Sequence, residues 1–238
     1  MTRLDDPALV ASEYADETRL RRRAAAYTGV ETGEDARVRL VQAVAEVRPR
    51  RVLEVGCGWG ELAEWIARET GADVVAVDLS PRMVDLARER GVAARIADVQ
   101  QLPFGDGEFD CVVAAWMLYH VPDLHRALSE VVRVLRPAGR FVAATNSRLH
   151  LIEVRELVGS GPSNLSFSRE SGRELLSAHF AAVQQMDIDG ELEFAGRDEV
   201  AEYVGVSIVM SPFIANLPAA IPEPFVARRA NAIFVATR

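Results

Sequence analysis

From residue 50 onward, short apolar runs alternate with segments whose apolar residues recur at helical spacing. Apolar runs of this length, bounded by polar or turn residues, predict strands, here at 51–55, 73–77, 93–97, 110–115 and 140–145. Helical periodicity between them predicts helices at 61–69, 81–90 and 124–135. Strands and helices that alternate at this spacing predict an α/β fold with a mostly parallel sheet and helices on both faces.

Local signals mark the ends of several helices. Ser80 is a typical N-cap residue and Pro81 suits the first helical turn, so a helix is expected to begin there. The run at 137–139, Pro-Ala-Gly, ends the preceding helix. Pro49 ends a helical pattern that covers residues 4–48.

The pattern weakens after Asn146. Helices are expected over 149–158, 169–180 and 197–203, strands over 183–188 and 232–236, and a proline-rich loop over 211–224. The sheet prediction therefore depends mainly on residues 50–146.

The glycine-rich turn after the first of these strands is the strongest chemical signal. The strand at 52–55 runs into the turn Gly-Cys-Gly-Trp-Gly at 56–60, and a helix follows. Glycines are required where backbone takes a positive φ or approaches a ligand closely, and a helix N-terminus favours a carboxylate. A dinucleotide fingerprint would need a glycine where Glu61 stands, which disfavours a nicotinamide-dependent oxidoreductase. A turn without a ligand is the alternative.

A carboxylate ends the next predicted strand. Asp78 follows the glycine turn by about the interval at which an acidic residue meets a ribose in doubly wound folds. Its two oxygens can accept hydrogen bonds from both ribose hydroxyls. The alternative is an N-cap or turn aspartate.

Composition narrows the function further. The chain of 238 residues has a net charge of -8, which disfavours nucleic acid as a partner. No apolar stretch is long enough to cross a bilayer, and the N-terminal segment is too polar for a signal peptide. The two cysteines, Cys57 and Cys111, suggest no disulfide framework, so a cytoplasmic protein is expected. Four histidines and two cysteines without zinc spacing predict no metal site.

Two further segments make a family resemblance specific. The run 97–104 contains Asp98, and the run 109–121 ends in Trp-Met-Leu-Tyr-His-Val. Together with the glycine turn and Asp78, in this order and spacing, they resemble the class I S-adenosylmethionine (SAM) dependent methyltransferases, in the bacterial small-molecule branch similar to the ubiquinone and menaquinone methyltransferases. Residues 135–140 resemble the family's Leu-Arg-Pro-Gly-Gly turn, with Ala138 replacing one glycine.

The resemblance implies a Rossmann-like fold and a set of cofactor contacts. The implied sheet has seven strands in the order 3-2-1-4-5-7-6, the last antiparallel. The methionine part of SAM is assigned to Glu54, Gly56, Cys57, Gly58 and Gly60. The ribose is assigned to Asp78, the adenine to Leu79, Met83, Asp98 and Val99, and the methionine end also to the backbone carbonyl of Trp116.

A narrower resemblance, to bacterial class I methyltransferases of unassigned substrate, concerns the N-terminus. Tyr14, Leu20 and Arg23 match the spacing of a helical lid in which Arg23 faces the SAM carboxylate. A solvated arginine run at 21–23 is the alternative. The expected organisation is an N-terminal helical lid at 1–48 and a SAM-binding domain at 49–238, within which 147–224 contributes an acceptor-side cap.

The acceptor side is less well defined. A base is needed only if the acceptor loses a proton. His120 is the best candidate for that base and Tyr119 a weaker one. A structural role for His120 is the favoured alternative, because members of the resembled family with different acceptors commonly carry histidine at this position. Asn146 and His150 follow the fifth strand of the core and are expected to contact the substrate. The stretch at 115–118 lacks the Asn/Asp-Pro-Pro-aromatic motif of enzymes that methylate nucleic-acid adenine.

The predicted reaction is methyl transfer from SAM to an O, N or C atom of a small molecule, with S-adenosylhomocysteine as product and no metal. A secondary-metabolite acceptor is inferred from the resemblance alone. No membrane partner is expected, and the apolar stretch 204–218 is either a homodimer surface or a wall of the acceptor pocket. The alternatives are a SAM-binding protein that does not methylate, and a peptide or protein methyltransferase.

Overall fold

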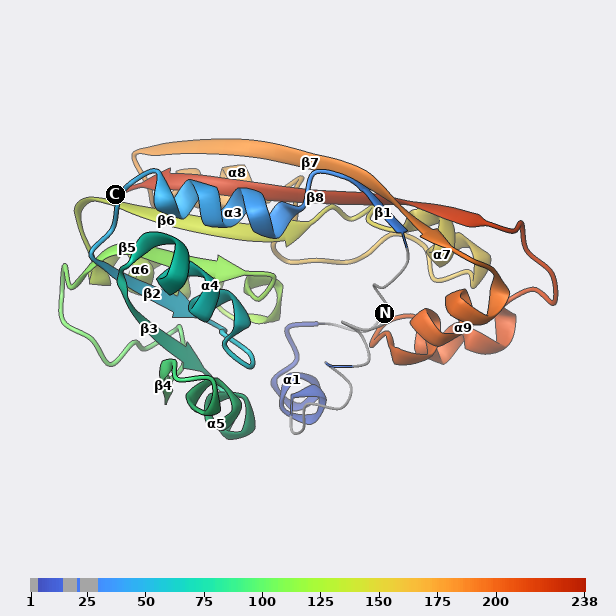
Figure 1. Ribbon diagram of the computed structural model, residues 1–238, viewed down its shortest axis with the longest axis horizontal. Helices are drawn as coiled ribbons and strands as arrows, with labels where there is room; N and C mark the ends of the chain where they lie inside the picture. Colours follow the sequence, from blue (N-terminus) through green and yellow to red (C-terminus); the bar gives the residue numbers. More distant parts are fainter. Residues whose placement is uncertain (1–3, 15–20, 22–29) are drawn as a thin grey trace.

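The computed structural model describes residues 4–14, 21 and 30–238 of the chain. Its centre is one mixed sheet (Figure 1). The strands are β1 (Val30–Gly33), β2 (Arg51–Val55), β3 (Asp73–Asp78), β4 (Ala93–Ile96), β5 (Phe109–Ala115), β6 (Leu135–Asn146), β7 (Ala182–Phe194) and β8 (Phe225–Thr237). Among the described residues they lie in the order β1-β7-β8-β6-β5-β2-β3-β4.

The strand order confirms the predicted topology and corrects the strand number. β2, β3, β4, β5 and β6 pair in parallel, and β8 runs antiparallel to both β6 and β7. The described sheet has eight strands rather than seven, because β1 pairs antiparallel with the outer edge of β7. The prediction of one helical pattern over 4–48 was wrong here. A four-residue strand is too short to interrupt a helical periodicity visibly, and its pairing partner lies far away in sequence.

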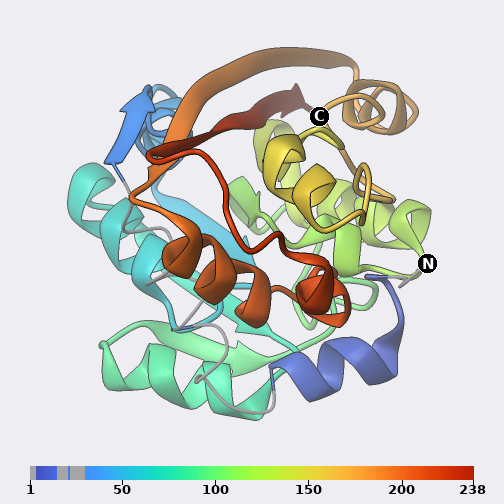
Figure 2. The same cartoon turned by 90° about the vertical axis from the view of Figure 1, so that its right-hand side faces the viewer.

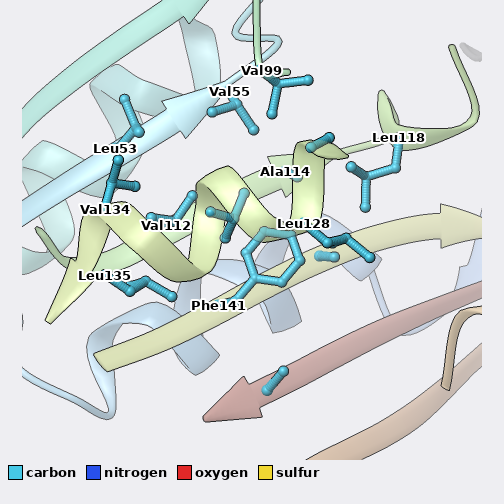
Figure 3. Close-up of a cluster of buried hydrophobic side chains, with 14 of the residues drawn as sticks. Leu53, Val55, Val99, Val112, Ala114, Leu118, Leu128, Val134, Leu135 and Phe141 are labelled. Atoms are coloured by element: carbon cyan, nitrogen blue, oxygen red, sulfur yellow. The ribbon is translucent and has the colours of Figure 1, made fainter. Parts of the chain in front are cut away.

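Helices cover both faces of the sheet, as predicted. The helices α3 (Ala36–Ala45), α4 (Glu61–Thr70) and α5 (Pro81–Glu89) pack on one face, together with Cys111 and Val113 of β5. On the other face α6 (Leu124–Val134) and α8 (Gly172–Ser177) pack against Val112 and Ala114. Alternate residues of β5 thus point to opposite faces, and all but the last, Ala115, are buried, as expected for a central strand. Figure 3 shows α6 lying over this second layer, with Leu128 beside Phe141.

The helix boundaries near the predicted site follow their local signals. The hydroxyl of Ser80 accepts a hydrogen bond from the N–H of Met83, and Pro81 opens α5. The Pro-Ala-Gly run at 137–139 lies inside β6, where the pairing with β5 shifts register. Ala138 there has a φ of 61°, the conformation that a glycine adopts more easily.

The C-terminal half carries a projecting hairpin. β7 and β8 pair from Ala182 and Thr237 to Phe194 and Phe225, well beyond the strands predicted at 183–188 and 232–236. Figure 1 shows both strands continuing past the ends of β5 and β6 toward α9 (Arg197–Val206). With α7 (Ile152–Leu157) and the short 3-10 helix η2 (Ser211–Asn216), this end has its own apolar core. That core includes Val154, Leu192, Phe194, Val200, Val204 and Phe225.

The N-terminal helix α1 (Pro7–Glu13) lies beside α5 in both views (Figures 1 and 2). The hydroxyl of Ser80 fixes this contact by donating a 2.6 Å hydrogen bond to the carbonyl of Tyr14, which follows α1. α1 therefore lies over the carboxyl ends of the parallel strands, where ligands bind in doubly wound sheets.

Candidate cofactor and acceptor site

The glycine turn between β2 and α4 is shaped so that only glycine fits at its first and last positions. Gly56 and Gly60 have φ values of 69° and 81°. A Cβ on Gly56 would lie 2.7 Å from the Cβ of Met117, and one on Gly60 would lie 2.8 Å from the Cβ of Ala87. Gly60 is buried against α5 and does not line the cofactor cavity. It closes the turn, whereas Gly56 allows the backbone to face the cavity.

Asp78 connects the end of β3 to this turn. One carboxylate oxygen accepts a 2.9 Å hydrogen bond from the N–H of Gly58, and the other accepts one of 2.9 Å from the N–H of Ser80. Burial raises the pKa of Asp78, and the backbone N–H groups of Ser80, Gly58 and Leu79 oppose that rise. The carboxylate therefore holds the turn in place and also faces the cavity, where it can accept further hydrogen bonds.

Glu54 is the least satisfied group of the site. Its side chain is 2% exposed, and its Oε2 atom is buried without a hydrogen-bond partner among the described residues. Burial, and then the nearby charge of Asp78, raise the pKa of Glu54 to about 8. The backbone N–H of Ala63 partly opposes this rise. A buried carboxyl oxygen without a partner carries a free-energy cost. A ligand cation next to it would remove that cost, so these residues fit the ammonium group of a bound SAM.

A cavity of about 370 Å³ extends from Glu54 along this edge of the sheet. Most of the predicted cofactor residues line it, namely Tyr14, Glu54, Gly56, Cys57, Gly58, Asp78, Leu79, Asp98, Val99 and Trp116. Met83 does not, since it is fully buried beneath the start of α5. Burial also raises the pKa of the Cys57 thiol, so this residue faces the cavity as a neutral group.

Asp98 is already engaged within its own loop. Its carboxylate accepts a 2.8 Å hydrogen bond from the N–H of Gln100, and the Gln100 amide lies 3.1 and 3.0 Å from its two oxygens. Leu79, by contrast, is 56% exposed and forms an uncovered apolar rim. The far end of the cavity thus combines a fixed carboxylate with an apolar surface, which suits a heteroaromatic ring bearing an amino group.

The N-terminal segment contacts His120 in the wall of this cavity. The hydroxyl of Tyr14 lies 3.1 Å from Nε2 of His120, and Nδ1 of His120 lies 2.8 Å from the carbonyl of Leu4. A carbonyl only accepts, so Nδ1 carries a proton, and in the neutral form of His120 the Nε2 atom accepts from the hydroxyl of Tyr14. Both ring nitrogens are engaged by the N-terminal segment. This geometry supports a positioning role for His120 more than a role as general base.

The predicted lid residues Leu20 and Arg23 lie outside the described residues. Arg21 is described, and its guanidinium carbon lies 5.7 Å from the ring centroid of Trp59 in the glycine turn. Arg21 belongs to the run at 21–23 for which a solvated role was the alternative. A cation over an aromatic ring is a weak attraction, and it adds a second contact between this segment and the cofactor loop.

A second cavity of about 510 Å³ adjoins the first at Trp116 and His120. The four predicted acceptor-side residues, Tyr119, His120, Asn146 and His150, all line it. Ser207, Ile208 and Val209 also line it, as one of the two alternatives for the stretch 204–218 expected. Sequence reasoning missed three further wall residues from the C-terminal half, Tyr203, Arg229 and Asn231. They lie on a helix and a strand whose ends were misplaced, and no motif marks them.

His150 forms part of the wall of this cavity as an uncharged side chain. It is buried, and its Nδ1 accepts a 3.1 Å hydrogen bond from the N–H of Ala230. Burial lowers the pKa of His150 to about 4. In the described ranges no group of three or more His, Cys, Asp and Glu side chains is placed to hold a metal ion. The helices of the same ranges include none long and apolar enough to cross a membrane.

The fold and the two cavities define a Rossmann-like class that binds a ligand above the carboxyl ends of its parallel strands. Residues 53–143 match a family model described as a methyltransferase domain. The methyltransferase GfsG of Streptomyces halstedii is 34% identical over 168 residues, covering 67% of this chain and 60% of that protein. The 27-O-demethylrifamycin SV methyltransferase of Amycolatopsis mediterranei is 31% identical over 186 residues, covering 73% and 65%.

Solved structures support the same fold. The YcgJ protein from Bacillus subtilis matches with a TM-score of 0.63 at 18% identity, covering 84% of this chain and 98% of that one. The [4+2]-cyclase SpnF matches with a TM-score of 0.60 at 24% identity, covering 96% and 94%. Residues 53–143 thus form a methyltransferase domain, and the chain is similar to class I SAM-dependent methyltransferases of the bacterial small-molecule branch. It spans less than two thirds of the length of the two curated relatives described above.

Proposed function

We propose that this protein transfers a methyl group from SAM to an O, N or C atom of a small molecule, with a secondary metabolite as the acceptor class and S-adenosylhomocysteine as product. The observation that carries the proposal is the buried Oε2 atom of Glu54, which has no hydrogen-bond partner among the described residues and lies at the head of the cofactor cavity. The match of residues 53–143 to a methyltransferase domain, and the similarity of this chain to GfsG and to the rifamycin methyltransferase, support the acceptor class.

The proposed contacts follow the cavity from end to end. Glu54 receives the ammonium of the methionine part, beside the backbone of Gly56, Cys57 and Gly58. Asp78 accepts from the ribose hydroxyls, while Asp98 and the backbone of Val99 bind the adenine edge. Leu79 covers the adenine face, and the carbonyl of Trp116 borders the methionine end. When bound, SAM supplies a methyl group already activated by its positive sulfur.

Alignment and exclusion of water are the tasks left to this chain's own residues. Tyr14 lines both cavities, and its link to His120 holds the N-terminal segment over their junction. Residues 1–48 are proposed to act as the lid, with Arg23 at the SAM carboxylate, although α3 in this segment packs on the sheet. Residues 147–224 are proposed as the acceptor-side cap.

A non-methylating SAM-dependent protein is the second candidate. The fold is shared with SpnF, whose name describes a cyclase, and both nitrogens of His120 are engaged. A peptide or protein methyltransferase is a weaker candidate, because a cavity of about 510 Å³ is the size that small molecules use. Homodimer formation and a cytoplasmic location stay predictions.

The test is a calorimetric titration of the purified protein with SAM and S-adenosylhomocysteine, with NAD as the control. Binding of both sulfur ligands and not of NAD is expected. Mass-spectrometric detection of a methylated product in a panel of hydroxylated small molecules then separates the two candidates. Cofactor binding without any product across the panel would favour the non-methylating alternative, and absent cofactor binding would overturn both.

A further inference from the structure

The wall between Trp116 and β8 contains a hydrogen-bonded chain of three side chains. The indole Nε1 of Trp116 donates to Oδ1 of Asn146 at 3.1 Å, and Nδ2 of Asn231 donates to the same oxygen at 2.6 Å. Asn146 and Asn231 are directly opposite each other on β6 and β8. Cross-strand neighbours of this kind have side chains on the same face of the sheet.

This chain fixes the orientation of both amides. An indole N–H can only donate, so the Asn146 atom that faces Trp116 must be the oxygen. The Asn231 atom that approaches that oxygen must then be its amide nitrogen. The orientation of the two amides therefore follows from the donor and acceptor chemistry of the three side chains.

One donor and one acceptor of the two amides remain without a partner in this chain of hydrogen bonds. Oδ1 of Asn146 accepts two hydrogen bonds, which leaves its Nδ2 as a donor, and Asn231 donates through Nδ2, which leaves its Oδ1 as an acceptor. Neither leftover atom has a partner within the described part of the chain, and both residues line the acceptor cavity. Asn231 is only 8% exposed, so its polar atoms cannot be satisfied by bulk solvent at no cost.

The charges around this pair do not favour a cationic ligand. The carboxylates in the cavity wall are those of Asp35 and Glu61. Asp35 accepts from the backbone N–H and the guanidinium of Arg37, and Glu61 accepts from the indole of Trp59 at 3.0 Å. Arg229 adds a guanidinium to the same wall. A ligand rich in oxygen fits this environment better than an ammonium.

We propose that Asn146 and Asn231 recognise a methyl acceptor that carries a carbonyl oxygen next to a hydroxyl group. The carbonyl accepts from Nδ2 of Asn146, and the hydroxyl donates to Oδ1 of Asn231. This inference rests on the proposed function, since it describes the acceptor half of the same site. An acceptor lacking the hydroxyl leaves Oδ1 of Asn231 unpaired, which weakens binding roughly ten- to a hundredfold.

The test measures binding of three matched probes to the whole chain saturated with S-adenosylhomocysteine, by ligand-observed NMR. The probes are phenacyl alcohol, its methyl ether and phenacylamine. Phenacyl alcohol is expected to bind about tenfold or more tightly than either of the others. The Asn146→Asp variant keeps the shape and the acceptor for Trp116 but replaces the Nδ2 donor by an oxygen, so it should lose this preference and gain affinity for phenacylamine.

Val209→Ala is the control, because Val209 lines the same cavity and takes no part in the amide chain. It should keep the preference for phenacyl alcohol. Equal binding of the three probes, no binding of phenacyl alcohol, or an unchanged preference in Asn146→Asp overturns the proposal. Binding of S-adenosylhomocysteine, measured in the same samples, shows whether the cofactor assignment stands independently and whether each variant is folded.

Discussion

Strands β2 and β3 end at the cofactor cavity, whereas β7 and β8 run past the acceptor cavity and project beyond it. In the cofactor half, the wall is therefore made by turns, with backbone N–H groups and the carboxyls of Glu54 and Asp78. In the acceptor half, the wall is made largely by side chains of strands and helices, such as Asn146, Asn231 and Tyr203.

This difference separates two kinds of recognition. Turn backbone at parallel strand ends has a fixed geometry that cannot change without rebuilding the sheet, so it suits a ligand that never varies. Side chains on a hairpin can be exchanged without altering the strands, so they suit a ligand that differs between relatives. Substitutions in the cofactor half should therefore act through backbone geometry and charge, whereas substitutions in the acceptor half should act through single side-chain contacts.

The largest effect is expected from Gly56→Ala. It adds a Cβ that would lie 2.7 Å from Met117 at a φ of 69°, and strain with overpacking costs about 2–4 kcal/mol in the free energy of unfolding. The matched control is Gly71→Ala, which has a φ of 68° and nothing within 4 Å of the new Cβ. Chemical denaturation should show a clearly larger loss for the first variant; equal losses would mean that close packing at Gly56 is unimportant.

Asp78→Ala should come next. It removes the proposed partner of two ribose hydroxyls and the acceptor for the N–H of Gly58, at about 1.5–3 kcal/mol for a charged group. SAM affinity should fall roughly ten- to a hundredfold by calorimetry. Asp85→Ala, on the exposed side of α5, is the control and should leave the affinity unchanged. Unaltered SAM affinity in Asp78→Ala would contradict the ribose assignment.

Glu54 should make stability depend on pH. Its pKa is raised from 4.5 to about 8 in the folded protein, so the folded state holds a proton that the unfolded state has lost in this range. Its contribution to stability is therefore present below pH 4.5 and is lost as pH rises toward 8, with a slope of up to about 1.4 kcal/mol per pH unit. Glu54→Gln should flatten this part of the stability curve. Identical curves for the two proteins would contradict the raised pKa.

The smallest effect is expected from Tyr14→Phe. It removes one hydroxyl that bonds His120 at 3.1 Å and leaves the ring in place, a loss of about 0.5–1.5 kcal/mol. SAM affinity should fall a few fold while global stability barely changes. If His120 were instead an essential base, Tyr14→Phe would free its Nε2 and raise the rate of methyl transfer, and this opposite sign distinguishes the two roles.

The turn, the strand ends and the helix start of the cofactor half could be predicted from the sequence because their signals are local. The glycine spacing, the Ser80-Pro81 helix start and Asp78 all act within a few residues of the turn they form. Met83 was the error there: its position in the motif predicted contact with adenine, but α5 turns it into the core. Periodicity alone could not show which side of the helix start faces the cavity.

The acceptor half was harder because its structure depends on distant pairing. β1 exists through its pairing with β7, and neither its length nor its composition marks it. The end of β7 did carry a signal, since Ile188 and Leu192 are buried between acidic neighbours and the buried Phe194 follows Glu193. Gly190 and the charges hid this alternation. Asn231 follows no motif, and only the cross-strand pairing brings it to Asn146.

The central claim is that the buried carboxyl of Glu54 binds the ammonium group of SAM. Proton release on cofactor binding tests this claim most directly. S-adenosylhomocysteine is titrated calorimetrically into the protein near neutral pH, in two buffers of different ionisation enthalpy. Because the pKa of Glu54 is about 8 before binding, pairing with an ammonium should release close to one proton. Glu54→Gln should bind more weakly and release none. Binding without proton release would contradict the role of Glu54, and no binding at all would contradict the cofactor site itself.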